Sequence, residues 1–258
     1  MELTAGVIIF LIVVQFAAYF VKGITGFGDP LISQPMLSLT TMESNEITPL
    51  NLLLNWPVNF YMAFTNRKSF SVKNTIPMIS FLLIGMIPGM LLLKYASSWI
   101  IKAILGLLIL LIGVEMLTRK ESTASGGNPI VMALVSLASG FTAGLFGISL
   151  FFVAYIERTG YVNKNQFRGQ MCFIFAIENT VRVIVYILAG LYTTSVIKMA
   201  AIAAIGGAAG LFCGSRVDTK LSEQTVRKII VIVFMCAGFS TFVKAVWPAL
   251  SALLVTSN

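Results

Sequence analysis

Two short glycine-rich tracts interrupt long apolar stretches of this chain. The first is Lys22-Gly-Ile-Thr-Gly-Phe-Gly-Asp-Pro30, and the second is Ser139-Gly-Phe-Thr-Ala-Gly-Leu-Phe-Gly-Ile148. Glycine lacks the side chain that favours a helix, and it lets another backbone or a ligand come close. Backbone inside lipid cannot stay unpaired, so a broken helix must be packed in protein or line a polar cavity. Two such breaks in matching positions of two halves of a membrane protein predict a transport site.

The composition is that of an integral membrane protein. Of 258 residues, 57% are hydrophobic and 11% are charged, whereas a soluble domain has about 25% charged residues. No basic region precedes the first apolar run, so we expect that run to belong to the mature chain rather than to a cleaved signal. The net charge of +8 fits the excess of Lys and Arg in cytoplasmic loops better than it fits nucleic-acid binding.

Eight apolar stretches follow one another along the chain. About 20 residues cross a bilayer as a helix, and six of the stretches have the length of one span. The first and fifth are longer, and they contain the glycine tracts. The stretches cover residues 4–42, 47–65, 75–93, 99–117, 129–156, 169–190, 195–213 and 227–247.

The basic residues between the stretches select a topology. Eight simple spans divide the Lys and Arg almost evenly between the two sides of the membrane, whereas a re-entrant fifth stretch puts most of them on one side. The positive-inside rule favours the second arrangement. The connections beside the first stretch contain no Lys or Arg, so the distribution of basic residues does not decide whether that stretch is re-entrant.

If the first stretch is also a re-entrant hairpin, each half is a hairpin followed by three spans, and the second half is inverted relative to the first. The predicted fold is therefore all-α and membrane-embedded, with two inverted repeats at 1–120 and 121–258 forming one transport domain. Both termini face outward in this arrangement, and the polar connector 118–128 joins the repeats.

Helix ends at the tracts are candidates for binding an anion, because unpaired N–H groups and the helix dipole attract negative charge. Glycine is also common at tight membrane-helix contacts, so packing is the alternative for each tract. Lys22 directly precedes the first break, where a cation at membrane depth is either functional or extended towards a headgroup. Asp29 follows the tract and has three open roles: capping the returning helix, pairing with Lys22, or titrating during transport.

A polar group lies within the apolar segment Ile174–Leu188. Glu178 and Arg182 are four residues apart, hence on one helical face, and Asn179 is close to that face. One interpretation is a structural ion pair; the other is that Arg182 offers its planar donors to an oxyanion, with Glu178 holding it or exchanging a proton. The equivalent span of the first half contains Asn51, Asn55 and Asn59, which either link helices or line a cavity.

The two tracts and the polar spans after them resemble the TauE/SafE family of sulfite and organosulfonate exporters. The resemblance is carried by Gly23-Ile-Thr-Gly26-Phe-Gly28 and Gly140-Phe-Thr-Ala-Gly144-Leu-Phe-Gly147, supported by Asn179, Tyr186 and Gly190, and it covers nearly the full length. Where the family has further glycines, this chain has Asp29-Pro30 and Ile148-Ser149, which leaves the substrate open. The resemblance implies export of a small sulfur oxyanion such as sulfite, sulfoacetate or a related sulfonate.

Together these arguments predict a secondary transporter that works by alternating access, with the two hairpins meeting at one anion. Asp29 and Glu178 are candidates for proton coupling or ion pairing. The predicted substrate-binding residues are Lys22, Thr25, Gly26, Gly28, Asn55, Asn59, Gly144, Gly147, Asn179 and Arg182.

Three rival functions remain at this point: an anion channel, an importer of a sulfur anion or organic acid, and an intramembrane enzyme. The chain contains no histidine, and its three cysteines are isolated, so the enzyme is the weakest of the three and no metal or cofactor is expected. The expected partners are a small sulfur anion and the lipid bilayer of the cell membrane, without nucleic acid; a homo-oligomer is left open.

Overall fold

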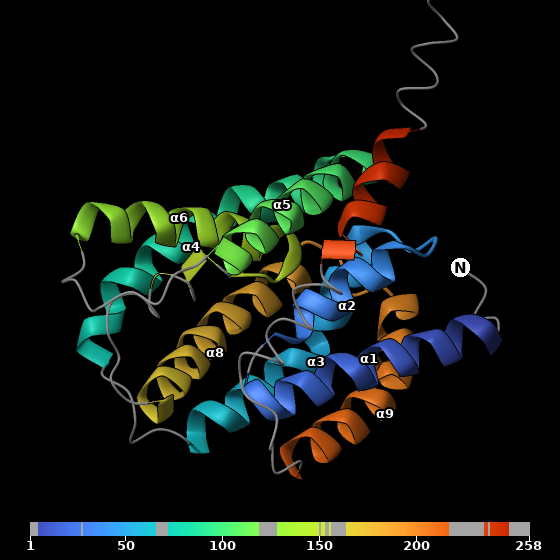
Figure 1. Cartoon of the computed structure of the whole chain (residues 1–258), viewed down its shortest axis with the longest axis horizontal. Coiled ribbons are helices and arrows are strands. Elements are labelled where there is room, and N and C mark those ends of the chain that lie inside the picture. Colours follow the sequence, from blue (N-terminus) through green and yellow to red (C-terminus); the bar gives the residue numbers. More distant parts are fainter. Residues whose placement is uncertain are drawn as a thin grey trace, which may run out of the picture. The chain divides into compact units, whose positions relative to one another are not determined.

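The computed structural model describes residues 5–26, 28–65, 72–118, 128–149, 151–152, 155, 164–216, 235–236 and 238–247. Within them every regular element is a helix (Figure 1), which confirms the predicted all-α class. The helices are α1 (Ala5–Thr25), α2 (Asp29–Ser38), α3 (Ser44–Thr65), α4 (Val72–Tyr95), α5 (Ser98–Thr118), α6 (Pro129–Phe146), α8 (Lys164–Leu188) and α9 (Thr194–Arg216), and residues 238–247 are also helical.

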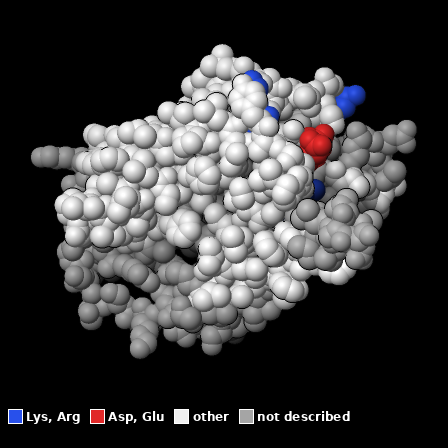
Figure 2. All heavy atoms as spheres, turned by 90° about the horizontal axis from the view of Figure 1, so that it is seen from above, with Lys and Arg blue, Asp and Glu red and all other residues white. Residues whose placement is uncertain are grey.

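Five helices in the described part of the chain are long and apolar enough to cross a membrane. They lie in α1, α4, α6, α8 and α9, and they expose large apolar side chains such as Ile84, Leu134 and Ile205. On the face drawn in Figure 2, few of the described atoms belong to acidic or basic residues. Helix α3 also has the length of a span, with 22 residues, but its four asparagines make it more polar. The chain is therefore a multi-pass membrane protein.

Both glycine tracts end a helix, as predicted. Gly26 and Gly28 have φ of 90° and 95°, and Gly147 has φ of 72°; side chains other than that of glycine disfavour this left-handed region. Pro30 then lies in the first turn of α2, where its missing N–H removes no helical hydrogen bond. A re-entrant hairpin implies an arm shorter than a full span on each side of the tract. The arms before the breaks are instead span-length, 21 residues in α1 and 18 in α6, while α2 has 10.

The chain divides into two compact units, and neither coincides with a predicted repeat. Unit 1 comprises Met1–Ile47, Tyr95–Arg119 and Ile202–Asn258, and unit 2 comprises Thr48–Lys94 and Lys120–Ala201. Each unit thus contains one glycine tract together with helices from both halves of the sequence. The assignment of 1–120 and 121–258 as inverted repeats, with re-entrant hairpins, stays a prediction.

Glycines hold helices in close contact inside each unit. In unit 1, a Cβ on Gly206, Gly210 or Gly214 of α9 would lie 2.1–2.2 Å from a backbone carbonyl oxygen of α1. In unit 2, a Cβ on Gly140 or Gly144 of α6 would lie 2.0–2.4 Å from a carbonyl oxygen of α4. No side chain fits at such distances. Since lipid supplies little hydrophobic drive between helices, this close backbone approach is a main source of their attraction.

Candidate functional site

In unit 1 an ion pair spans the first glycine break. The Lys22 ammonium lies 3.0 Å from a carboxylate oxygen of Asp29, and both side chains are almost fully buried. Lys22 is in the last turn of α1 and Asp29 in the first turn of α2. Each charge therefore complements the dipole of its own helix. Of the three roles left open for Asp29, pairing with Lys22 is present, and its side chain does not cap α2, whose N-cap is Gly28.

An aromatic side chain lies beside this pair. The Lys22 ammonium lies 5.6 Å from the centroid of the Tyr19 ring. The Tyr19 hydroxyl is buried and has no hydrogen-bond partner within the described part of the chain. Thr25, predicted to bind substrate, lies in the last turn of α1, and its side chain is outside the described residues.

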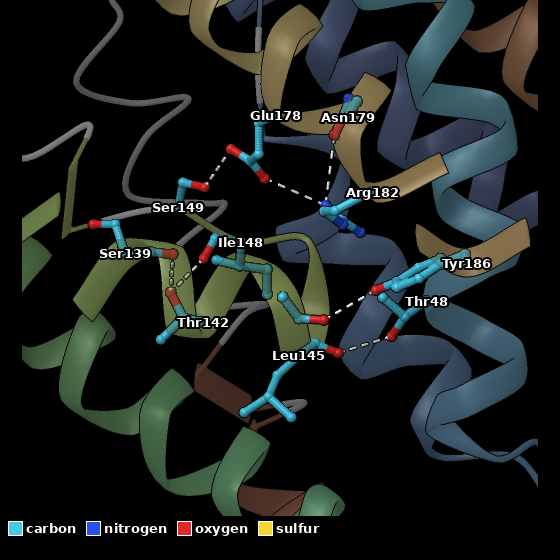
Figure 3. A network of polar contacts seen from close by, with 11 residues as sticks. Thr48, Ser139, Thr142, Leu145, Ile148, Ser149, Glu178, Asn179, Arg182 and Tyr186 are labelled. Carbon is cyan, nitrogen blue, oxygen red and sulfur yellow. Dashed lines mark hydrogen bonds and ion pairs between the residues drawn. The ribbon is translucent and has the colours of Figure 1, made fainter. Parts of the chain in front are cut away.

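In unit 2 side chains satisfy the backbone where α6 ends (Figure 3). The last carbonyls of a helix have no partner within it. Tyr186 of α8 donates its hydroxyl to the Gly144 carbonyl at 2.9 Å, and Thr48 of α3 donates to the Leu145 carbonyl at 3.1 Å. Thr142 donates to the Ile148 carbonyl beyond the break at 2.6 Å. The second break is thus held by hydroxyl groups from three helices.

Arg182 of α8 lies directly against this break. A Cβ on Gly147 would be 3.0 and 3.1 Å from the two terminal guanidinium nitrogens, so a larger residue there would displace them by a few tenths of an ångström. One of these nitrogens lies 3.4 Å from Glu178 and 3.5 Å from the Asn179 side-chain oxygen. Ser149, just after the break, donates to the other carboxylate oxygen of Glu178 at 2.9 Å (Figure 3). Both contacts of Arg182 are long beside the about 2.7–2.9 Å of a strong charge-assisted bond.

Several buried donors around Arg182 have no partner among the described residues. They are Arg182 Nε, Asn179 Nδ2 and the Tyr192 hydroxyl. The Tyr192 ring packs edge-on against Tyr186, with centroids 6.3 Å apart. Burial raises the pKa of Tyr192, against the opposing effect of Arg182, so its hydroxyl keeps its proton. An unsatisfied buried donor typically costs about 1–3 kcal/mol, and an acceptor that enters here recovers part of that cost.

The asparagines of α3 belong to the same unit. Asn51, Asn55 and Asn59 are all buried. Helix α3 packs on α8, where Trp56 donates its indole N–H to Thr180 at 3.1 Å. Their burial fits either a link between helices or the lining of a cavity, so the cavity-lining role stays a prediction.

The predicted site residues therefore fall into two groups. Lys22, Gly26, Gly28 and Asp29 lie together in unit 1; Asn55, Asn59, Gly144, Gly147, Glu178, Asn179 and Arg182 lie in unit 2. Gly144 has a second role, because it also packs against α4. The joining of both groups at one anion stays a prediction.

Sequence reasoning missed Thr48 and Tyr192. Thr48 lies at helical spacing from Asn51 and Asn55, and this periodic polar face was the signal that could have found it. Tyr192 lies between α8 and α9, and no pattern in the sequence marks it.

Comparison with known proteins gives one match. The family described as "Sulfite exporter TauE/SafE" matches residues 11–241, a range that includes both glycine tracts, Arg182 and most of the described helices. No curated protein and no solved structure matches the chain. The matched range covers most of the chain, so this membrane protein belongs to the TauE/SafE family of sulfite exporters.

Proposed function

We propose that the chain exports a small sulfur oxyanion, sulfite or a related sulfonate, by alternating access. Arg182, Asn179 and Tyr192 recognise the anion beside the Gly147 break. The observation that carries this proposal is the set of buried donors at that break that have no partner among the described residues, together with the long ion pair of Arg182. A pyramidal or tetrahedral oxyanion has the acceptors that these donors lack.

Glu178 is the competitor of the anion for Arg182. Ser149 holds one carboxylate oxygen, while the other is 3.4 Å from Arg182. An arriving oxyanion accepts bonds from the free Nε and, in a planar two-point geometry, from a neighbouring guanidinium nitrogen. Protonation of Glu178 would release Arg182 further, so this carboxylate is where proton coupling would act. The Lys22–Asp29 pair, in contrast, has its charge already matched.

The glycine contacts support an inverted-repeat arrangement, on which many alternating-access transporters are built. Helix α6 packs on α4, the second helix after the first tract hairpin. Helix α1 packs on α9, the second helix after the second tract hairpin. Each tract helix thus packs on a helix from the other half, at the same place in the order of elements.

The membrane potential suffices to drive export. With the inside negative, an anion moves outward with about 2.3 kcal/mol per charge per 100 mV. Efflux therefore requires no coupled ion.

The test is efflux of sulfite from proteoliposomes that contain the purified protein. We expect saturable efflux that speeds up when sulfite is also present outside, because a carrier returns faster when loaded. Arg182→Lys keeps the charge but removes the planar donors, and it should lower efflux at least about tenfold. The matched control is Arg216→Lys, at the exposed end of α9, which should transport normally.

Unsaturated current without this acceleration would instead identify a channel. Normal efflux by Arg182→Lys would remove Arg182 from the site. Accumulation of sulfite inside the vesicles against its own gradient, driven by an imposed proton gradient, would identify an importer.

A further inference from the structure

We propose that unit 1 contains a second anion site, which binds the phosphate of an anionic lipid headgroup. The site is a pocket of about 500 Å³. It is formed where α2 ends, where α5 begins and along residues 241–245. Its lining consists of Ser38, Leu39, Thr40, Ser98, Trp99, Lys102, Thr241, Lys244 and Ala245. This inference is independent of the transport site in unit 2.

Two ammonium groups give the pocket its charge. Within the described part of the chain, no carboxylate lies within ion-pair distance of Lys102 or Lys244. The two cations repel each other, so an anion between them is favourable. Glu43 and Glu46 attract Lys102 from outside the lining. The Glu46 carboxylate accepts the Glu43 N–H at 3.2 Å in the manner of a helix-capping group, and neither glutamate lines the pocket.

The hydroxyl groups of Ser38 and Thr40, at and just after the end of α2, are already used as donors. Ser38 donates to the Gln34 carbonyl at 2.7 Å, and Thr40 donates to the Leu37 carbonyl at 2.6 Å. Recognition therefore rests on the two lysines and on the amino-terminal end of α5, which begins at Ser98 and attracts anions through its dipole.

The aromatic residues around the pocket place it at headgroup depth. Trp99 lines it, and Trp99, Tyr95 and Trp247 are all more than half exposed. Exposed Trp and Tyr near the ends of membrane helices collect at the bilayer interface. At that depth the abundant anion is the lipid phosphate, and basic pockets between membrane helices are suited to it. The flexible stems of both lysines let their charges reach the headgroup.

The test measures lipid binding to the purified full-length protein in neutral detergent. Phosphatidylglycerol and phosphatidylcholine are titrated separately, and bound lipid is counted by native mass spectrometry. We expect phosphatidylglycerol to bind more tightly than phosphatidylcholine. The double variant K102Q/K244Q should lose about 10- to 30-fold of its phosphatidylglycerol affinity, since each lysine near an anionic lipid contributes about 1 kcal/mol. K102R/K244R should retain it.

The matched control is K198Q, which removes an exposed lysine from the first turns of α9 and should bind like the wild type. Inorganic phosphate is added as a competitor, to distinguish a site for a lipid headgroup from a site for free phosphate. Displacement of the lipid by millimolar phosphate would support the site with a soluble ligand, and resistance to it would support the headgroup. Equal binding of both lipids by the wild type would overturn the proposal, as would an equal loss in K198Q.

Discussion

The two glycine breaks contain similar groups in different arrangements. Each places a buried cation, a buried carboxylate and at least one left-handed glycine close together. In unit 1, Lys22 and Asp29 come from the two sides of the break itself and are 3.0 Å apart. In unit 2, Arg182 and Glu178 both come from α8, and the pair is 3.4 Å apart. The Lys22–Asp29 pair joins two helices across the turn between them. The Arg182–Glu178 pair lies within one helix and only packs against the turn at Gly147.

This difference separates a pair that holds a turn from a pair suited to recognition. An ammonium is a compact point charge, and Asp29 neutralises it at close range. A guanidinium has five donors in a fixed plane, and Glu178 and Asn179 leave its Nε unused. A glycine break beside a cation and a carboxylate thus supports two roles. The cation holds the turn where it comes from the broken helix itself, and it is available for recognition where it comes from α8.

The largest expected effect is on stability in unit 1. Lys22→Met leaves Asp29 buried without its cation and should destabilise the protein by about 3–5 kcal/mol. The double variant Lys22→Met/Asp29→Leu should recover much of that loss, because no charge remains buried. Thermal unfolding in detergent measures both. A single variant as stable as the wild type would show that Asp29 does not depend on Lys22.

The next effect is on anion binding, and it distinguishes the two units directly. Arg182→Met/Glu178→Leu should weaken sulfite binding about 100-fold, because it removes charge-assisted hydrogen bonds of about 1.5–3 kcal/mol each. Lys22→Met/Asp29→Leu should change binding by less than about threefold on the same scale. Isothermal titration calorimetry on variants shown to be folded measures both. A larger loss of sulfite affinity in Lys22→Met/Asp29→Leu than in Arg182→Met/Glu178→Leu would show that the anion binds in unit 1.

Substitution of the two turn glycines, Gly28 and Gly147, should have a smaller effect on stability, and only one of the two should affect sulfite binding. Gly28→Ala and Gly147→Ala should each cost about 1–2 kcal/mol of stability, because alanine is strained at positive φ. At Gly28 the nearest atom to a new Cβ is 3.8 Å away, whereas at Gly147 the Arg182 guanidinium is 3.0 Å away. Only Gly147→Ala should therefore weaken sulfite binding as well. Equal binding by both variants would contradict the contact of Arg182 with the anion.

The smallest effect compares two tyrosines, Tyr192 in unit 2 and Tyr19 in unit 1, whose hydroxyls have no hydrogen-bond partner among the residues that the structure describes. Tyr192→Phe should weaken sulfite binding by about three- to tenfold, the equivalent of one modest hydrogen bond. Tyr19→Phe should leave binding unchanged and serves as the control. Neither should lower the unfolding midpoint, since neither loses a hydrogen bond within the protein.

The sequence predicted the breaks better than it predicted their surroundings. Only glycine readily adopts the φ values at Gly28 and Gly147, so the helix ends were visible in the residue types. The Glu178–Arg182 pair followed from helical spacing. The capping of the Gly144 carbonyl by Tyr186 was not predictable, because the two residues are 42 apart and meet only through tertiary packing. For the same reason no pattern distinguished Gly144, which packs on α4, from Gly147, which turns the chain.

The contact of α1 with α9 bears on how the protein is made. Helix α1 leaves the ribosome before α9, and α2 to α6 and α8 are synthesised between them. The backbone of α1 therefore stays next to lipid or the insertion machinery until Gly206, Gly210 and Gly214 have been translated. A ribosome that stalls before α9 releases a chain in which that surface of α1 is uncovered.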